Sequence, residues 1–176
     1  MRLSFTLLAG ASALLLSGFS AQAGCADPRL PAQHRIPHIS LRTSAGVHVP
    51  RNGSAADNIV GTWRVTYTVE NNPFGDALIQ WHSDGTEWEN IDFPPSSGNL
   101  CMGSWKAIDG KHVYRSHIGW IYNDNQLVGY FTETETDKVA RDGNSYAGTN
   151  EQKVYDLDGN LLADVTGTSS ATRIAP

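Results

Sequence analysis

The sequence has little that would link it to nucleic acid, to a cofactor or to a peptidase. Its formal net charge is -5, and its basic residues form no stripe. Nucleic acid and anionic membranes need such a stripe, so neither is expected as a partner. The chain also lacks a nucleophile elbow, a glycine-rich phosphate loop, paired-cysteine zinc spacing and a His-Glu-x-x-His motif. We therefore expect neither a cofactor nor a metal, and hydrolase, nucleotide-dependent and zinc-peptidase functions are disfavoured.

Long hydrophobic runs are also absent beyond the first residues, so no membrane span is expected. Residues 1–23 combine Arg2, an apolar run over 5–16 and a small-residue site at Ala21-Gln22-Ala23. This pattern is typical of a cleavable secretory signal and is too short for a span. Gln22 stands where a lipoprotein signal usually has an aliphatic residue, which favours cleavage after Ala23 over lipidation of Cys25. We expect a secreted or periplasmic protein.

Cysteine is scarce, since the chain has only 2, Cys25 and Cys101. An exported chain reaches a compartment that permits disulfides. A bridge between the two would pin the N-terminal tail to the rest of the chain and contribute about 4 kcal/mol in the chain-entropy model. The alternative is a lipidated or free Cys25 with a buried, inert Cys101.

Residues 24–57 contain scattered Pro, Gly and Ser without a sustained period, which predicts an irregular tail or linker. The tail contains His34, His38 and His48, so a metal-capturing arm is an alternative to a plain linker. The loose spacing of the histidines favours the linker.

From residue 58 onward the chain is rich in Val, Ile, Thr, Tyr and Trp and is divided by Asp-Gly and Asp-Asn pairs. These features are typical of strands joined by tight hairpins. No stretch shows helical periodicity. The expected strands are residues 59–70, 77–83, 86–92, 100–108, 111–123, 126–139, 145–157 and 160–174. A meander of this size removes its edges by closing on itself, so we expect residues 58–176 to form an all-β, eight-stranded antiparallel up-and-down barrel.

The first and last expected strands carry a family resemblance. Alternation places Gly61 and Trp63 on the inward face of the first strand and Arg173 at the inward end of the last. A Gly-x-Trp followed by a distant arginine resembles the calycins, the lipocalin and avidin-like group. The resemblance implies that the arginine packs across the tryptophan at the barrel floor and that the barrel is a cup for a small, largely apolar molecule. The sequence shows no second or third lipocalin motif and no N-terminal helical turn, and allene-oxide-cyclase-like barrels are a close architectural alternative.

Counting outward from two-residue hairpins predicts which side chains share the lumen. The count pairs Val154 with Ala163 and Gln152 with Val165, then Glu133 with Gln152 and Glu135 with Asn150. For the strands at 111–123 and 126–139, the same count sets Ile118 beside Phe131, Ser116 beside Glu133 and Tyr114 beside Glu135. For the strands at 100–108 and 111–123, it places Trp105 opposite Tyr114 and Gly103 opposite Ser116. One odd-length loop would instead turn both glutamates to solvent. That alternative exposes Phe131, which favours the inward arrangement.

The predicted lumen has an apolar part and a polar patch, which suits a ligand with one polar end. The expected ligand-binding residues are Trp63, Tyr67, Trp105, Ser116, Ile118, Trp120, Phe131, Asn150 and Gln152. An enclosed carboxylate needs a partner or a raised pKa, and a raised pKa beside a phenol suits a general acid or base. The candidate catalytic residues are therefore Glu133, Glu135 and Tyr114.

Two further placements follow from the same count. Trp81 should face Trp88, and His82 should face Glu87. The paired tryptophans are expected to be packing. An acid–base or metal pair of His82 with Glu87 or Glu89 at the rim is the functional alternative. His117 should lie outside among Val113, Gly119 and Ile121. An outer face this apolar suggests a subunit contact and a homo-oligomer, and the alternative is that His117 points inward because the register is wrong.

Three functions remain open. The first is a secreted or periplasmic protein that binds a small hydrophobic or amphipathic molecule in its lumen. The second is a cofactor-free isomerase, cyclase or lyase that uses an interior glutamate and a tyrosine. The third is an interaction domain with a filled barrel. The sequence does not decide whether the protein is an enzyme.

Overall fold

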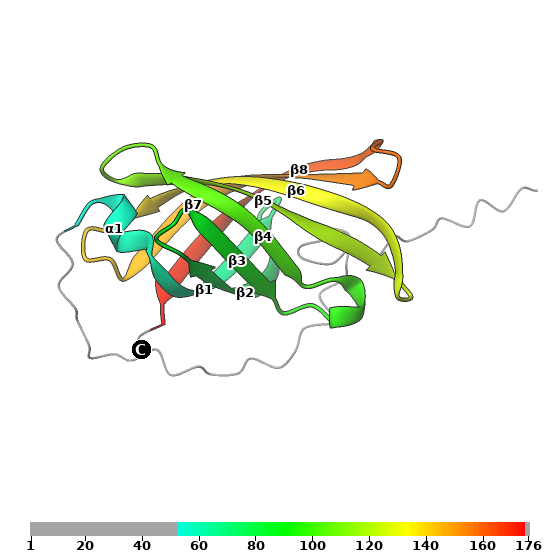
Figure 1. The fold of residues 1–176 in the computed structure, drawn as a ribbon, viewed down its shortest axis with the longest axis horizontal. Helices are drawn as coiled ribbons and strands as arrows, with labels where there is room; N and C mark the ends of the chain where they lie inside the picture. Colours follow the sequence, from blue (N-terminus) through cyan, green and yellow to red (C-terminus); the bar gives the residue numbers. More distant parts are fainter. Residues whose placement is uncertain (1–52, 175–176) are drawn as a thin grey trace, which may run out of the picture.

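The computed structural model describes residues 53–174, and they form a closed barrel of eight antiparallel strands in chain order, with β1 beside β8 (Figure 1). The expected meander barrel is therefore confirmed. The strands are β1 (Gly61–Val69), β2 (Asn72–Trp81), β3 (Thr86–Ile91), β4 (Leu100–Ala107), β5 (His112–Asn123), β6 (Gln126–Val139), β7 (Ser145–Asp156) and β8 (Leu161–Arg173). A single turn of 3-10 helix, η2 (Pro95–Ser97), lies between β3 and β4.

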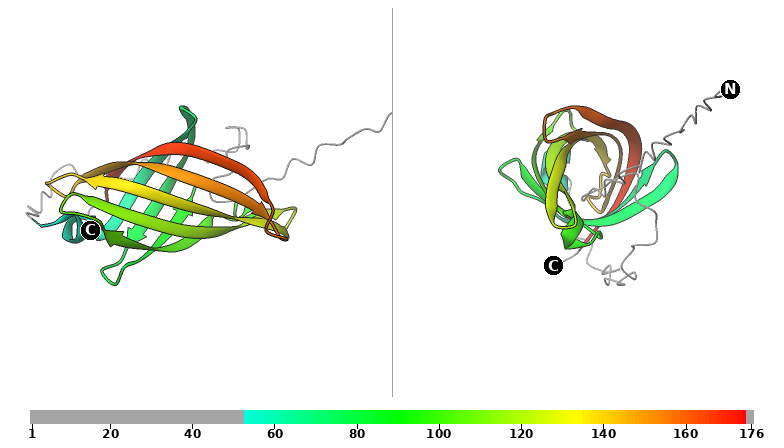
Figure 2. Two further views of the ribbon diagram at one scale, coloured as in Figure 1. Left: turned by 90° about the horizontal axis from the view of Figure 1, so that it is seen from above. Right: turned by 90° about the vertical axis from the view of Figure 1, so that its right-hand side faces the viewer.

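The ring closes where β1 pairs with β8, with Trp63 opposite Arg173 and Val65 opposite Ala171. Figure 2 shows the closed ring of strands in its right-hand view. Alternation buries Trp63, Val65 and Tyr67 in the lumen, as the period of two predicts. The barrel has no free edge, because each outer strand of the meander is hydrogen-bonded to the other.

A short helix, α1 (Ala55–Ile59), precedes β1 and differs from the irregular chain expected up to residue 57. Ser54 and Asp57 form a capping box that satisfies backbone N–H groups at its start. The backbone N–H of Ala55 donates to Gly110 O at 3.1 Å, and α1 contacts β4, β5 and β6 at one end of the barrel (Figure 1). A helix of 5 residues is too short to produce a hydrophobic period in the sequence.

Trp63 and Arg173 close this end of the barrel, as the calycin resemblance implies. The Arg173 guanidinium lies 4.1 Å from the centre of the Trp63 ring and donates to the Val60 carbonyl at 2.8 Å. The Trp63 indole N–H donates to the Ile59 carbonyl at 2.7 Å. Gly61 has a φ of +136°, and a Cβ there would lie 2.3 Å from Arg173 Nη1. The positive φ strains any residue with a side chain, so glycine is favoured at this position.

Loop lengths decide which face of each strand points inward. Asp124 and Asn125 both have positive φ and form the expected two-residue hairpin, with Asn123 opposite Gln126. The β2–β3 and β4–β5 loops instead have three residues, since the N–H of His82 donates to Thr86 O and that of Ile108 donates to His112 O. The pairings expected there are each wrong by one position. Trp81 lies opposite Glu87, and Trp105 lies opposite Arg115.

A β-bulge in β6 changes the face that β5 presents to the lumen. Tyr122 pairs with Leu127, but Ile121 pairs with Gly129, so Val128 is the extra residue. Beyond the bulge, His117 lies opposite Glu133 and Arg115 opposite Glu135. The expected pairing of β5 with β6 is therefore wrong by one position, and the two faces of β5 are exchanged.

The register of β6, β7 and β8 is as predicted. Glu133 pairs with Gln152 and Glu135 with Asn150, and Val154 pairs with Ala163. A bulge between Val154 and Tyr155 offsets an odd-length turn at the end of this hairpin, so the inward set is unchanged.

Several expectations concern residues outside 53–174. These are the signal segment 1–23, the tail histidines His34, His38 and His48, and Cys25. Cys101 is fully buried on β4, and its bridge to Cys25 stays a prediction. Within residues 53–174, no helix is both long and apolar enough to cross a membrane.

Candidate functional site

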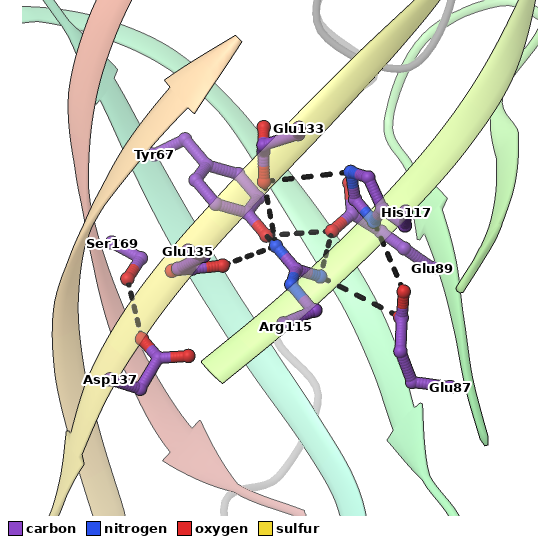
Figure 3. Close-up of polar contacts among 9 residues, drawn as sticks. All are labelled: Tyr67, Glu87, Glu89, Arg115, His117, Glu133, Glu135, Asp137 and Ser169. Carbon is purple, nitrogen blue, oxygen red and sulfur yellow. Dashed lines mark hydrogen bonds and ion pairs between the residues drawn. The ribbon is translucent and has the colours of Figure 1, made fainter. Parts of the chain in front are cut away.

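One guanidinium lies at the centre of the lumen and contacts carboxylates from two other strands. Arg115, on β5, is 1% exposed. Its Nη1 donates to Glu89 Oε2 at 2.8 Å, and its Nη2 donates to Glu133 Oε1 at 2.8 Å and also to Glu135 Oε2. Figure 3 shows these side chains converging on Arg115 from β3 and β6. Planar guanidinium groups suit such multiple carboxylate contacts.

His117 links two of the same strands beside Arg115. Its Nδ1 lies 3.2 Å from Glu87 Oε1, and its Nε2 lies 3.5 Å from Glu133 Oε1. The imidazole and the Phe131 ring form a T-shaped contact, with ring centres 5.8 Å apart. A histidine between two carboxylates is a proton-transfer arrangement, because the imidazole can accept a proton at one nitrogen and release it at the other.

Tyr67 and Asp137 complete the group. The Tyr67 hydroxyl donates to Glu89 Oε2 at 2.6 Å and accepts from Arg115 Nη2 at 2.9 Å. Ser169 Oγ donates to Asp137 Oδ1 at 3.1 Å. We call the seven ionisable residues other than Tyr67 the charged cluster: Glu87, Glu89, Arg115, His117, Glu133, Glu135 and Asp137. All of them are buried.

Glycines on neighbouring strands make room for these side chains. A Cβ at Gly103 would lie 2.4 Å from His117 Cβ and 2.7 Å from Glu87 Oε1. A Cβ at Gly148 would lie 2.3 Å from Asp137 Oδ1. Long polar side chains thus replace the aliphatic packing that would normally fill a small barrel.

Burial dominates the acid–base behaviour of β6. It raises the pKa of Glu133 to about 7, although His117 and Arg115 act in the opposite direction. Burial also raises the pKa of Asp137 well above its usual value, and the neighbouring Glu135 adds to the increase. Glu133 is therefore an enclosed carboxyl group that exchanges its proton near neutral pH.

The other groups respond to the balance between burial and charge. Burial acts to lower the pKa of His117, as does Arg115, but Glu133 and Glu87 outweigh them and the pKa is raised. Burial acts to raise the pKa of Glu87, but Arg115 and His117 outweigh it and the pKa is lowered. Burial raises the pKa of the Tyr67 phenol.

Eight of the expected site residues face the lumen. The inward placement of Glu133 and Glu135 agrees with the structure, in which they are 5% and 1% exposed. Trp63, Tyr67, Phe131, Asn150 and Gln152 are also buried, and Trp105 is partly buried with its ring 5.7 Å from that of Trp81. Whether these residues bind a ligand stays a prediction.

Four expected site residues lie on the outside, because the β6 bulge exchanges the faces of β5. Ile118 is 44% exposed and Trp120 is 52% exposed. Tyr114 and Ser116 share their outward face, and Tyr114 lines an open depression of about 470 Å³ with threonines of β6 and β7. Tyr114 is therefore not beside the lumen side chain of Glu133, and the expected glutamate–phenol pair is wrong. Tyr67 is the phenol in the lumen.

The rim and the outer face also differ from expectation. Trp88 is 51% exposed and stacks on His82, so it does not face Trp81, and Glu87 lies inside rather than beside His82. His117, Val113 and Ile121 line the lumen instead of forming an outer subunit contact. Among residues 53–174, no group of three or more His, Cys, Asp or Glu side chains is placed to hold a metal ion.

Sequence reasoning missed Arg115 and His117 and placed Glu87 and Glu89 only at the rim. A signal for them was present, because β3, β5 and β6 each carry ionisable residues two positions apart, which share one face of a strand. Pairing Arg115 with Glu135 rather than with a polar outer residue would have matched opposite charges across the strands.

No protein-family model and no curated protein matches the chain. The solved structure of EF1p2_mFAP2b bound to DFHBI is similar to it, with 18% sequence identity and a TM-score of 0.48 over 70% of this chain and 99% of that one. A likeness of this degree carries no information about function. The closed eight-stranded barrel, with Arg173 packed across Trp63, fits a calycin-like fold.

Proposed function

We propose that this protein binds a small amphipathic molecule in the barrel lumen. The supporting observation is a row of buried polar side chains whose hydrogen-bonding capacity is not used. Gln152 is 2% exposed, and neither atom of its amide has a hydrogen-bond partner among the described residues. Glu87 Oε2 and His117 Nε2 also lack a hydrogen bond there.

These groups lie next to one another around the barrel. The cross-strand pairs run from Glu87 to Gly103, from there to His117, and on to Glu133 and Gln152. Leaving buried polar atoms without partners costs about 1–3 kcal/mol each. A polar group of a bound ligand would satisfy these atoms, which supports the proposal.

The neighbouring positions on the same strands are apolar. Phe131 and Val154 pair with each other directly beside the Glu133–Gln152 pair, and both are almost fully buried. A ligand with a polar head and an apolar body would place its two parts against these two kinds of surface.

Tryptophan fluorescence can test lumen binding if the outer tryptophans are removed. Of the 5 tryptophans, Trp88 and Trp120 are more than half exposed, so the Trp88→Phe/Trp120→Phe variant reports on the inward ones. We expect saturable quenching by at least one member of a panel of amphipathic ligands, with the same dissociation constant as in the wild type. Quenching that disappears in the double variant would indicate surface binding and contradict the proposal.

A second candidate function is acid–base catalysis without a cofactor, as in an isomerase, cyclase or lyase. It is favoured by the contact of Glu133, whose pKa is raised to about 7, with His117. In such a reaction Glu133 would take a proton from the substrate and His117 or Glu133 would return one. Glu133→Gln should abolish turnover of any substrate that is found, and full turnover by that variant would remove the residue from the mechanism.

We also propose export of the chain, on the signal-like residues 1–23 alone. N-terminal sequencing of the protein from its own source should give Gly24 as the first residue. An intact Met1, or a lipidated Cys25, would contradict this proposal.

A further inference from the structure

The strands β3 and β5 reverse the usual assignment of faces in a small barrel. On β3, Glu87 and Glu89 are almost fully buried, whereas Trp88 between them is 51% exposed. On β5, His117 is buried and its neighbour Ile118 is 44% exposed. Antiparallel strands with one solvated face normally alternate between apolar side chains inside and polar ones outside. Here the charged cluster takes the inner positions, so apolar side chains take the outer ones.

These apolar side chains form one surface on neighbouring strands (Figure 1). Trp88 pairs with Met102, and Met102 pairs with Ile118. Leu100 and Trp120 lie two positions away on β4 and β5 and therefore share the same face. We call this surface the apolar outer face: Leu78, Trp88, Leu100, Met102, Ile118 and Trp120, each 40–53% exposed.

The apolar outer face is large for a monomer. A side chain of this size presents on the order of 200 Å² when fully exposed, so six that are about half exposed present roughly 600 Å². The largest apolar patch of a typical monomer covers about 300–600 Å². Flanking polar positions would bring the buried area toward the roughly 800 Å² that each partner contributes to a stable interface.

Charge distinguishes this face from the other side of the barrel. On β1 and β2, Arg64 lies 2.7 Å from Asp76, and on β7 and β8 Lys153 lies 2.7 Å from Glu151 and 3.9 Å from Asp164. A depletion of charge together with Trp and Met is typical of the core of a protein interface. The two cross-strand rows of the apolar outer face consist of neutral residues: Gln80, Trp88, Met102, Ile118 and Thr132 in one, and Leu78, Asn90 and Leu100 in the other.

The neutral polar residues make this face self-complementary. Gln80 and Asn90 lie in the two rows, and Ser104 pairs with Ser116 in the adjoining row. Amide and hydroxyl groups both donate and accept hydrogen bonds, so each can pair with a copy of itself. In a two-fold interface the same patch meets itself, and a charge near the axis would face a charge of the same sign. A face of neutral groups avoids that repulsion.

The N-terminal tail and a lipid surface fit the apolar outer face less well than a second copy does. Residues 24–52 carry Arg29, Arg35, Arg42 and Arg51 with a single acid, Asp27, and these guanidinium groups would meet no carboxylate in the two rows. Lipid chains would leave the amides and hydroxyls of the face without hydrogen-bond partners, which is costly. A second copy supplies both apolar surface and hydrogen-bonding groups.

We infer that two copies of this chain pack through the apolar outer face, sheet against sheet, as a two-fold symmetric dimer. Removal of apolar surface from water drives the association. The strands β3 and β5 then carry the charged cluster on their inner face and the dimer contact on their outer face. The dimer is independent of the proposed lumen binding, because it uses only outward side chains.

Sedimentation velocity of the mature protein, residues 24–176, measures the association directly. We expect dimers at micromolar concentrations and monomers on dilution. Met102→Lys and Ile118→Lys each place a charge in the middle of the face, at side chains that are 53% and 44% exposed in the single chain. We expect each to raise the dimer dissociation constant at least about thirtyfold, which is the effect of losing an interface hot spot.

Thr166→Lys is the matched control. It adds the same charge at an exposed position of β8, on the opposite side of the ring from β4, and should leave the dissociation constant unchanged. Near-ultraviolet circular dichroism of each variant establishes that the barrel is folded.

Trp88 and Trp120 report whether the face is covered. Acrylamide should quench their fluorescence less in the dimer than in monomeric Met102→Lys. In the Trp88→Phe/Trp120→Phe background, which keeps the inward tryptophans, adding Met102→Lys should leave the quenching unchanged.

A protein that stays monomeric at every concentration overturns the dimer. In such a monomer, shielding of Trp88 and Trp120 from acrylamide would assign the face to the tail, and binding to phosphatidylcholine vesicles would assign it to a lipid surface. A dimer that both lysine variants leave intact, or that Thr166→Lys weakens equally, would place the contact elsewhere on the barrel and also overturn the inference.

Discussion

The floor of the barrel, where Trp63, Tyr146 and Arg173 meet, and the charged cluster are stabilised by different interactions. At the floor, Trp63 packs against Tyr146, with ring centres 4.9 Å apart, and under the Arg173 guanidinium. In the charged cluster, Arg115 and His117 hold carboxylates that would be costly to bury alone. The floor gains its stability by removing apolar surface from water, which does not depend on pH. The stability of the charged cluster depends on protonation.

Removing the central cation should have the largest effect. Arg115→Met leaves three hydrogen-bonded carboxylates without their counter-charge, so we expect a loss of about 5 kcal/mol in the free energy of unfolding at pH 8. At pH 5 the loss should be smaller, because Glu133 and Asp137 can take up protons. Urea unfolding followed by circular dichroism measures both values. An equal loss at the two pH values would show that Arg115 acts mainly by packing.

The matching change at the floor is Trp63→Ala. Trp63 is fully buried, and its removal leaves a cavity beside Tyr146 and Arg173, so we expect a loss of about 4 kcal/mol. The loss should be the same at pH 5 and pH 8, since no group contacted by the indole changes charge in that range. A strong pH dependence would contradict the separation of floor and cluster.

The wild-type protein should lose stability as the pH rises through neutrality. The pKa of Glu133 is raised in the folded state from 4.5 to about 7, so its contribution is fully present below about 4.5 and is lost as the pH passes 7. This shift corresponds to a decrease on the order of 3 kcal/mol between pH 5 and pH 8. The raised pKa of His117 acts in the same direction. The lowered pKa of Glu87 affects stability only at pH values below the ordinary pKa of a glutamate. In that range the free energy of unfolding increases as the pH rises.

Glu133→Gln tests the source of that slope. Its carboxamide cannot titrate, so the fall in unfolding free energy between pH 5 and pH 8 should be clearly smaller than in the wild type. The measurement is urea unfolding over that range, with Glu151→Gln as the exposed control. A slope unchanged in Glu133→Gln would assign the pH dependence to other groups.

A smaller effect is expected from filling the space beside His117. Gly103→Ala places a Cβ 2.3 Å from Ser116 O and 2.4 Å from His117 Cβ, so the backbone of β5 and the imidazole must both shift, at a cost of about 1–3 kcal/mol. Gly110→Ala is the matched control, because a Cβ there has nothing within 4 Å. Chemical unfolding gives the free energy of unfolding of both variants. Equal values would mean that the charged cluster does not need the space at Gly103.

Alternation and turn chemistry were enough to predict the barrel, its closure and two of its strand registers, those of β6 with β7 and of β7 with β8. The inward sets of β1, β6, β7 and β8 follow from the sequence because each strand has a clear apolar face, and the Glu133–Gln152 pair follows from them. α1 was not predicted, since one capped turn has no period; its signal was the spacing of Ser54 and Asp57.

The inward face of β5 could not be obtained by counting, because it depends on one extra residue in β6. The only local sign of that bulge is Gly129, where a Cβ would lie 2.2 Å from Tyr155 O. Asp-Gly pairs add a second ambiguity, since they suit both two-residue and three-residue loops. Gly85, with a φ of +88°, is in a three-residue loop. Four of the seven residues of the charged cluster were misplaced for these reasons: Glu87, Glu89, Arg115 and His117.

The most direct test is a carbon-13 NMR titration of the Glu133 carboxyl group, assigned by comparison with Glu133→Gln. We expect a titration midpoint at about 7, because burial raises the pKa of Glu133 more than His117 and Arg115 lower it. A midpoint of about 4.3, the ordinary value of a solvated glutamate, would show that this side chain is in water and that the lumen holds no such site.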